Sequence, residues 1–162
     1  LWIGHGFRTT EVSHREVCYF LGMNYGTNVN SLCLINPKFY HLDTCFCPLD
    51  RGHLLFYPKA FNSSDTDLIY DKFGYDNCIE VSDEDADNFA CNAISLDNNV
   101  ILNKASYKLK YDLEKHGYAV YENNMSEFLL SGGSTKCSIL HLDFHSIEEC
   151  SLNDDIYSYR ED

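Results

Sequence analysis

The chain has 162 residues and a formal net charge of −13, from 25 acidic residues and 12 Lys and Arg residues. Its hydrophobic fraction of 44% fits one packed globular domain and excludes an intrinsically disordered chain. The acidic balance supplies no basic footprint for nucleic acid, and the apolar runs at residues 54–57 and 139–140 are too short to cross a bilayer. We therefore expect an acidic, soluble, folded domain.

Patterns of apolar and turn residues predict strands and helices in alternation. Strands are expected at residues 1–6, 28–35, 39–49, 53–57, 78–81, 91–96, 100–102, 118–121 and 137–142. Helices are expected at residues 10–23, 64–74 and 106–116, with a capping residue at Ser106 and a hairpin turn at residues 97–99. The order strand–strand–helix–strand recurs, which indicates repeated α/β units rather than a Greek key or a doubly wound sheet.

The two ends of the sequence differ in character. The chain starts inside an apolar, strand-like run and has no signal-peptide pattern, so we expect a cytoplasmic protein that is incomplete at its N-terminus. Residues 1–145 are expected to form the folded domain. Residues 146–162 are acidic with scattered apolar side chains, and they predict a surface helix or a loose tail.

Eight cysteines could in principle form four disulfides. The length of the chain, its apolar core and the missing secretory signal favour reduced thiols instead. Most of the cysteines lie in apolar runs such as residues 32–35, where cysteine behaves as a small buried hydrophobe.

Residues 39–49 are the first candidate for chemistry. On a strand, His41, Asp43, Cys45 and Cys47 would share one face, opposite the apolar side chains between them. A polar solvent face is the commoner explanation of such alternation. Zinc binding by the histidine and the two cysteines is a weaker alternative, because structural zinc favours CxxC-type loops and no partner pair is present.

Two further segments are candidates for binding and catalysis. Gly132 and Gly133 belong to a small loop that leads to Cys137, and glycines allow a backbone to approach a ligand closely. The loop lacks the spacing of a phosphate-binding loop, and its simpler interpretation is a tight turn before a buried thiol. Arg8 follows the first predicted strand, where it is either a solvated charge or a bidentate partner for a carboxylate.

An arginine after a strand, then His-x-Asp, then a late Gly-Gly-x-x-x-Cys together resemble the pentein superfamily of guanidino-group-modifying enzymes. This superfamily includes arginine deiminases, dimethylarginine dimethylaminohydrolases and amidinotransferases. The resemblance extends from residue 1 to about residue 144 and is most specific at residues 41–49. It implies an α/β propeller of five ββαβ units, of which this chain would hold about the last three.

The resemblance also implies a role for each candidate residue. Cys137 would attack the guanidinium carbon and form a covalent amidino-thioether. His41 would protonate the leaving amine and then activate water. Asp43 would hold guanidinium nitrogens, Arg8 would bind the substrate carboxylate, and the glycines of the 131–137 loop would line the substrate site. No cofactor and no metal is implied.

The function expected from this resemblance is hydrolysis of the guanidino group of arginine or a methylated arginine, which gives citrulline with ammonia or an alkylamine. The expected partner is a small guanidino compound, and a homo-oligomer is compatible with the sequence. The family's second catalytic acid lies ahead of the strand that begins here at residue 1, and no residue in this sequence matches it. The missing acid favours a non-catalytic pentein remnant that binds arginine-like ligands. An amidinotransferase and a cysteine/histidine metal protein also stay open as alternatives.

Overall fold

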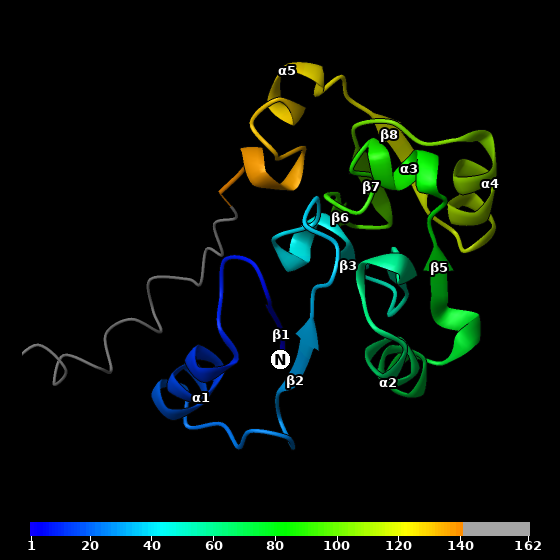
Figure 1. The fold of residues 1–162 in the computed structure, drawn as a ribbon. Helices are drawn as coiled ribbons and strands as arrows, with labels where there is room; N and C mark the ends of the chain where they lie inside the picture. Colours follow the sequence, from blue (N-terminus) through cyan, green and yellow to red (C-terminus); the bar gives the residue numbers. More distant parts are fainter. Residues whose placement is uncertain (141–162) are drawn as a thin grey trace, which may run out of the picture.

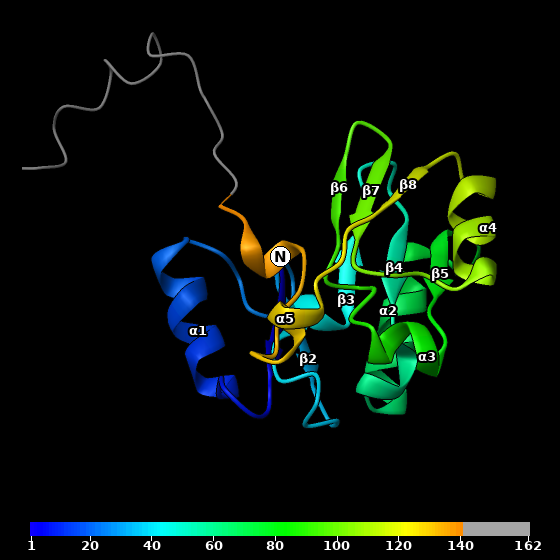
Figure 2. The ribbon, with the colours of Figure 1, turned by 90° about the horizontal axis from the view of Figure 1, so that it is seen from above.

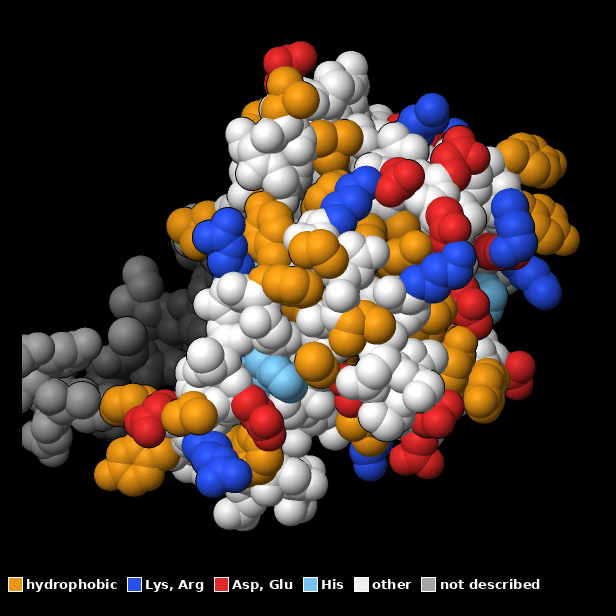
Figure 3. Space-filling view, viewed as in Figure 1, with side chains coloured by type: hydrophobic (Ala, Val, Ile, Leu, Met, Phe, Trp, Pro, Cys, Tyr) orange, Lys and Arg blue, Asp and Glu red, His pale blue; other side chains and the backbone are white. Residues whose placement is uncertain are grey.

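The computed structural model describes residues 1–140, and these form a mixed α/β structure with three small sheets (Figure 1). The helix or tail expected at residues 146–162 and the end of the strand expected at 137–142 lie outside the described residues. Within residues 1–140, no helix is long and apolar enough to cross a bilayer. On the face drawn in Figure 3, Lys and Arg side chains lie among Asp and Glu side chains, without a continuous basic patch for a phosphate backbone.

The first sheet has two parallel strands joined by a helix. Its elements are β1 (Trp2–His5), α1 (Glu11–Phe20) and β2 (Asn30–Cys33). The buried side chain of His14 on α1 hydrogen-bonds to the Ser31 hydroxyl at 2.9 Å and to the carbonyl oxygen of Gly4 at 3.2 Å. One imidazole therefore ties the helix to both strands.

The second sheet contains the centre of the core. Its elements are β3 (Phe46–Pro48), β4 (Leu54–Phe56), α2 (Ser63–Phe73) and β5 (Cys78–Glu80), with β4 antiparallel to β3 and parallel to β5. All three side chains of β4 are fully buried, as expected for a short, continuous apolar strand that is covered on both faces. Each contributes about 1.5–3 kcal/mol to folding by leaving water.

The third sheet repeats the order of the second. Its elements are β6 (Ile94–Leu96), β7 (Asn99–Leu102), α4 (Tyr107–Lys115) and β8 (Ala119–Glu122), with β7 antiparallel to β6 and parallel to β8. Figure 2 shows β6 and β7 as a projecting hairpin. Its turn places Asp97 and Asn98 at φ values of 50° and 64°, as a two-residue hairpin requires. The expected strand–strand–helix–strand order thus occurs twice.

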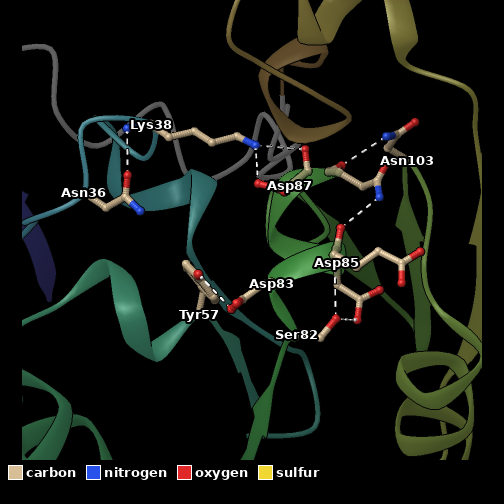
Figure 4. A network of polar contacts seen from close by, with 10 residues as sticks. Asn36, Lys38, Tyr57, Ser82, Asp83, Asp85, Asp87 and Asn103 are labelled. Carbon is tan, nitrogen blue, oxygen red and sulfur yellow. Dashed lines mark hydrogen bonds and ion pairs between the residues drawn. The ribbon is translucent and has the colours of Figure 1, made fainter.

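A short helix, α3 (Asp83–Asp87), connects the second and third units (Figure 4). The buried Asp85 carboxylate accepts hydrogen bonds from the Ser82 hydroxyl at 2.7 Å and from the backbone N–H of Ser106 at 2.6 Å. Ser106 caps α4, as its sequence position predicts, by accepting a hydrogen bond from the N–H of Leu109. Further short helical elements are η2 (Pro58–Ala60), η3 (Tyr75–Asn77) and α5 (Ser126–Leu129).

Two predicted strands are wrong where they matter for the candidate site. Residues 39–45 contain the short 3-10 helix η1 (Leu42–Thr44), and only Phe46–Pro48 is a strand. The backbone N–H and the hydroxyl of Thr44 both donate to the carbonyl oxygen of His41, at 3.1 and 2.6 Å, which closes a turn that an extended strand cannot form. Similarly, η4 (Lys136–Ser138) replaces the start of the strand expected at 137–142.

Candidate active site

The two short 3-10 helices bring Cys137 and Asp43 together. The Cys137 sulfur lies 3.6 Å from Oδ2 of Asp43, across 94 positions of the sequence. Figures 1 and 2 both draw the corresponding orange and cyan segments side by side. Cys137 is exposed, whereas the other six cysteines among the described residues are buried or half-buried. None of these seven cysteines is bonded to another within residues 1–140, and Cys137 is the most exposed of them.

The surroundings of Cys137 favour its neutral form when no ligand is bound. Partial burial and the charge of Asp43 raise the pKa of the Cys137 thiol, and a hydrogen bond from Asn92 opposes this shift. A planar cation beside the Asp43 carboxylate would offset the negative charge and favour the thiolate. The pair therefore suits a cationic ligand.

Sequence reasoning missed Asn92, whose side chain is fully buried beneath the site. Its Oδ1 accepts hydrogen bonds from the backbone N–H groups of Ser134 at 2.9 Å and Cys137 at 3.2 Å. Its Nδ2 donates to the carbonyl oxygen of Asp43 at 3.1 Å and to the Cys137 sulfur at 3.2 Å. The sequence does contain one signal for this residue, an amide side chain within the apolar run at residues 91–96. A polar side chain buried in such a run needs hydrogen-bond partners.

Tyr40, also missed, gathers three of the predicted residues around one ring. Its hydroxyl donates to the carbonyl oxygen of Gly132 at 3.0 Å. The Arg8 guanidinium lies 5.1 Å from the ring centroid, within the range of a cation–π contact, and the His41 ring lies edge-on at 4.7 Å. In the sequence, nothing distinguishes Tyr40 from the other eleven of the 12 tyrosines.

Close contacts favour glycine at both positions of the loop. Gly132 has a φ of +82°, and a Cβ there would lie 2.1 Å from the Tyr40 hydroxyl oxygen. A Cβ on Gly133 would lie 3.0 Å from Cβ of Cys137. Both glycines therefore allow the loop to approach its neighbours, as glycine at such positions does.

The six predicted site residues lie in two groups. In the first group, Asp43 and Gly133 each lie next to Cys137. In the second group, Arg8, His41 and Gly132 each contact Tyr40.

Cys45 and Cys47 do not share a polar face with His41, since both are buried in the core while His41 is exposed. Burial raises the pKa of Cys45, and it raises the pKa of Cys47 to about 11. Within residues 1–140, no group of three His, Cys, Asp or Glu side chains is placed to hold a metal ion.

No family model matches the chain. It is 44% identical over 142 residues to the bifunctional arginine dihydrolase/ornithine cyclodeaminase AgrE of Nostoc, a match that covers 88% of this chain and 20% of the relative. It is 36% identical over 139 residues to the N(G),N(G)-dimethylarginine dimethylaminohydrolase of Mycobacterium tuberculosis, which covers 86% of this chain and 44% of the relative.

A solved structure has a similar fold. The product-bound N-terminal domain of ArgZ, an arginine dihydrolase from cyanobacteria, matches with a TM-score of 0.80 and 43% identity over 84% of this chain and 48% of that chain. The chain thus spans about half or less of the length of the relatives it matches. By its motifs and these matches, the chain is a homologue of the guanidino-group-modifying enzymes of the pentein superfamily.

Proposed function

We propose that this chain contributes the nucleophile and part of the substrate site of an enzyme that hydrolyses the guanidino group of arginine or a methylated arginine. The observation that carries the proposal is the 3.6 Å contact between the Cys137 sulfur and the Asp43 carboxylate. Support comes from the relatives, since they include arginine dihydrolases and a dimethylarginine dimethylaminohydrolase. One ArgZ structure contains a covalently bound reaction intermediate.

Substrate binding follows from charge. The Asp43 carboxylate accepts N–H bonds from the planar guanidinium, and the Arg8 guanidinium pairs with the carboxylate at the other end of the substrate. With the cation in place, the charge of Asp43 no longer opposes ionisation of Cys137. The substrate therefore helps to generate the thiolate that attacks it.

The reaction has two stages. The Cys137 thiolate adds to the guanidinium carbon, and the C–N bond breaks as His41 donates a proton to the departing amine. This leaves an amidino-thioether. His41 then takes a proton from water, the resulting hydroxide adds to the same carbon, and the C–S bond breaks to return the thiolate and release a ureido product. A histidine can play both parts because its ordinary pKa is near 6.5.

We further propose that the repeated units belong to a five-unit α/β propeller, with residues 1–145 contributing about three units. The two complete ββαβ units and the parallel β1–α1–β2 unit support this arrangement. A non-catalytic protein that binds arginine-like ligands is the second candidate. The neutral thiol that burial and Asp43 favour in the free protein supports that alternative, because a protonated cysteine is a weak nucleophile.

The test is product analysis with a matched cysteine variant. The protein is incubated with arginine or with asymmetric dimethylarginine, and citrulline, ornithine, ammonia and dimethylamine are quantified. Cys137→Ala should abolish product while calorimetry still detects substrate binding, and Cys78→Ala, at a half-buried thiol, should leave turnover unchanged. Full activity of Cys137→Ala would overturn the proposal.

Two other outcomes separate the alternatives. Arginine binding by the wild-type protein without any product would favour the non-catalytic candidate. An amidino group found on an added acceptor amine such as glycine would identify a transferase, because water and the acceptor compete for the same thioether.

A further inference from the structure

We propose that the Asn92 side chain is the positioning residue of this site: it fixes the Cys137 sulfur beside Asp43 and stabilises the thiolate with an N–H donor. The inference rests on the proposed role of Cys137 as the nucleophile. Asn92 does not act on the substrate in this account. It acts through the two groups that do.

Every hydrogen-bonding position of the Asn92 side-chain amide has a partner in the site. A side-chain amide offers two N–H donors and two acceptor lone pairs, and here all four have partners. Rotation of the amide by 180° would point its N–H groups at the backbone N–H groups of Ser134 and Cys137. The four contacts therefore fix which end of the amide faces the sulfur.

The backbone around Asn92 is as constrained as its side chain. Its N–H donates to the carbonyl oxygen of Phe89 at 2.9 Å, and its carbonyl oxygen accepts from the N–H of Lys136 at 3.1 Å. The neighbouring Cys91 and Ala93 are both buried in the core. Asn92 thus connects the packed core directly to the surface turn that carries Cys137.

This position gives Asn92 two effects on the reaction. An N–H bond to an ionised acceptor is roughly twice as strong as one to a neutral acceptor, so the Nδ2–sulfur contact favours the thiolate over the thiol. The same nitrogen also holds the Asp43 backbone, which sets the spacing between nucleophile and carboxylate. A misplacement of about 1 Å at such a site costs on the order of 100-fold in rate.

The test measures the ionisation of Cys137 without any substrate. The rate of iodoacetamide alkylation at Cys137 is followed from pH 6 to 11 by peptide mass spectrometry in the wild type, Asn92→Asp and Asn92→Ala. Asn92→Asp keeps the size and the acceptor oxygen, whereas Asn92→Ala removes the donor without adding a charge. Both variants should move the midpoint up by at least about one pH unit and slow alkylation at pH 7 about tenfold, because only the thiolate reacts.

Asn103→Asp is the matched control. The Asn103 amide is also buried and bridges two segments, since it accepts from the N–H of Met125 at 2.9 Å and donates to the carbonyl oxygen of Asn88 at 3.0 Å (Figure 4). It has no hydrogen bond to Cys137 or Asp43 among the described residues. This variant should lower thermal stability and leave the alkylation profile unchanged.

An unchanged midpoint in both Asn92 variants would overturn the inference, even if their turnover fell. An equally large shift of the alkylation midpoint in Asn103→Asp would also overturn it, since the shift would then result from a general loss of stability. Turnover plays no part in this assay. A wild-type protein without guanidino hydrolysis would contradict the proposed function and leave the result on Asn92 intact.

Discussion

Replacement of Gly132 by alanine tests whether the geometry of the glycine loop depends on Tyr40. The added Cβ would lie 2.1 Å from the Tyr40 hydroxyl oxygen, at a backbone φ of +82°. The Tyr40 ring contacts Arg8 and His41, so it cannot move without disturbing both. Gly132→Ala should therefore weaken the fold and displace several site residues together.

The expected loss of stability has two parts. Alanine in the left-handed region costs about 1 kcal/mol relative to glycine. Separation of the Tyr40 hydroxyl from the Gly132 carbonyl oxygen costs about 1 kcal/mol more. The total of about 2 kcal/mol corresponds to a fall in Tm of about 4–8 °C for a protein of this size.

Gly26→Ala measures the cost of alanine at a positive φ alone, because Gly26 has a φ of +83° and nothing within 4 Å of the added Cβ. It should lower Tm by about 2–4 °C and leave alkylation of Cys137 unchanged. Gly132→Ala should lower Tm about twice as far and slow alkylation at least about tenfold, because the loop that carries the sulfur is displaced.

The reasoning also predicts a rescue. In a Tyr40→Phe background the hydroxyl is gone and the nearest remaining ring atom lies 3.1 Å from the added Cβ, a tight contact that a small shift of the ring relieves. Gly132→Ala should therefore cost less in this background than in the wild type. Calorimetric Tm values for the single and double variants measure this coupling. If Gly132→Ala lowers Tm by the same amount in the wild-type and Tyr40→Phe backgrounds, the argument is refuted.

Three further predictions concern charge. Because the Asp43 charge raises the pKa of Cys137, Asp43→Asn should speed iodoacetamide alkylation of the free protein at pH 7–8 and remove protection by arginine; slower alkylation would contradict this. The raised pKa also predicts that the wild-type alkylation rate is still rising between pH 8 and 9, whereas a plateau below pH 8 would contradict it. Asp85→Asn should lower the free energy of unfolding by about 1–3 kcal/mol in urea denaturation, because the buried carboxylate accepts hydrogen bonds from Ser106. As a control, Asp87→Asn should lower it by less than about 1 kcal/mol, because the ion pair between Asp87 and Lys38 is exposed.

Elements specified by neighbouring residues were predictable from the sequence. The Ser106 cap and the helix that follows it, and the hairpin turn at Asp97 and Asn98, depend on contacts within a few positions. The ββαβ order followed from the same local patterns. Local sequence patterns were therefore enough to predict the mixed α/β class.

The strand expected at residues 39–49 shows where local patterns mislead. Apolar alternation favoured an extended strand, but the Thr44 hydroxyl bonds the His41 carbonyl oxygen and closes a turn. This turn leaves His41 exposed and sends Cys45 and Cys47 into the core. The prediction therefore gave these residues the wrong backbone conformation.

Contacts between distant segments explain what the sequence could not reveal. The side-chain partners of Asn92 lie 42–49 positions away, and Tyr40 bonds Gly132 across 92 positions. No spacing rule connects such residues. The resemblance to the pentein superfamily pointed to Cys137, His41 and Asp43, whereas the residues that support them came from the structure.

The central claim is that Cys137 is an activated nucleophile in a site for guanidinium groups. The most direct test is mass spectrometry of the protein after exposure to a chloroacetamidine reagent, with and without excess arginine. The account predicts one adduct, on Cys137, that arginine suppresses. Labelling spread over several cysteines, or an adduct on Cys137 that arginine does not affect, would contradict it.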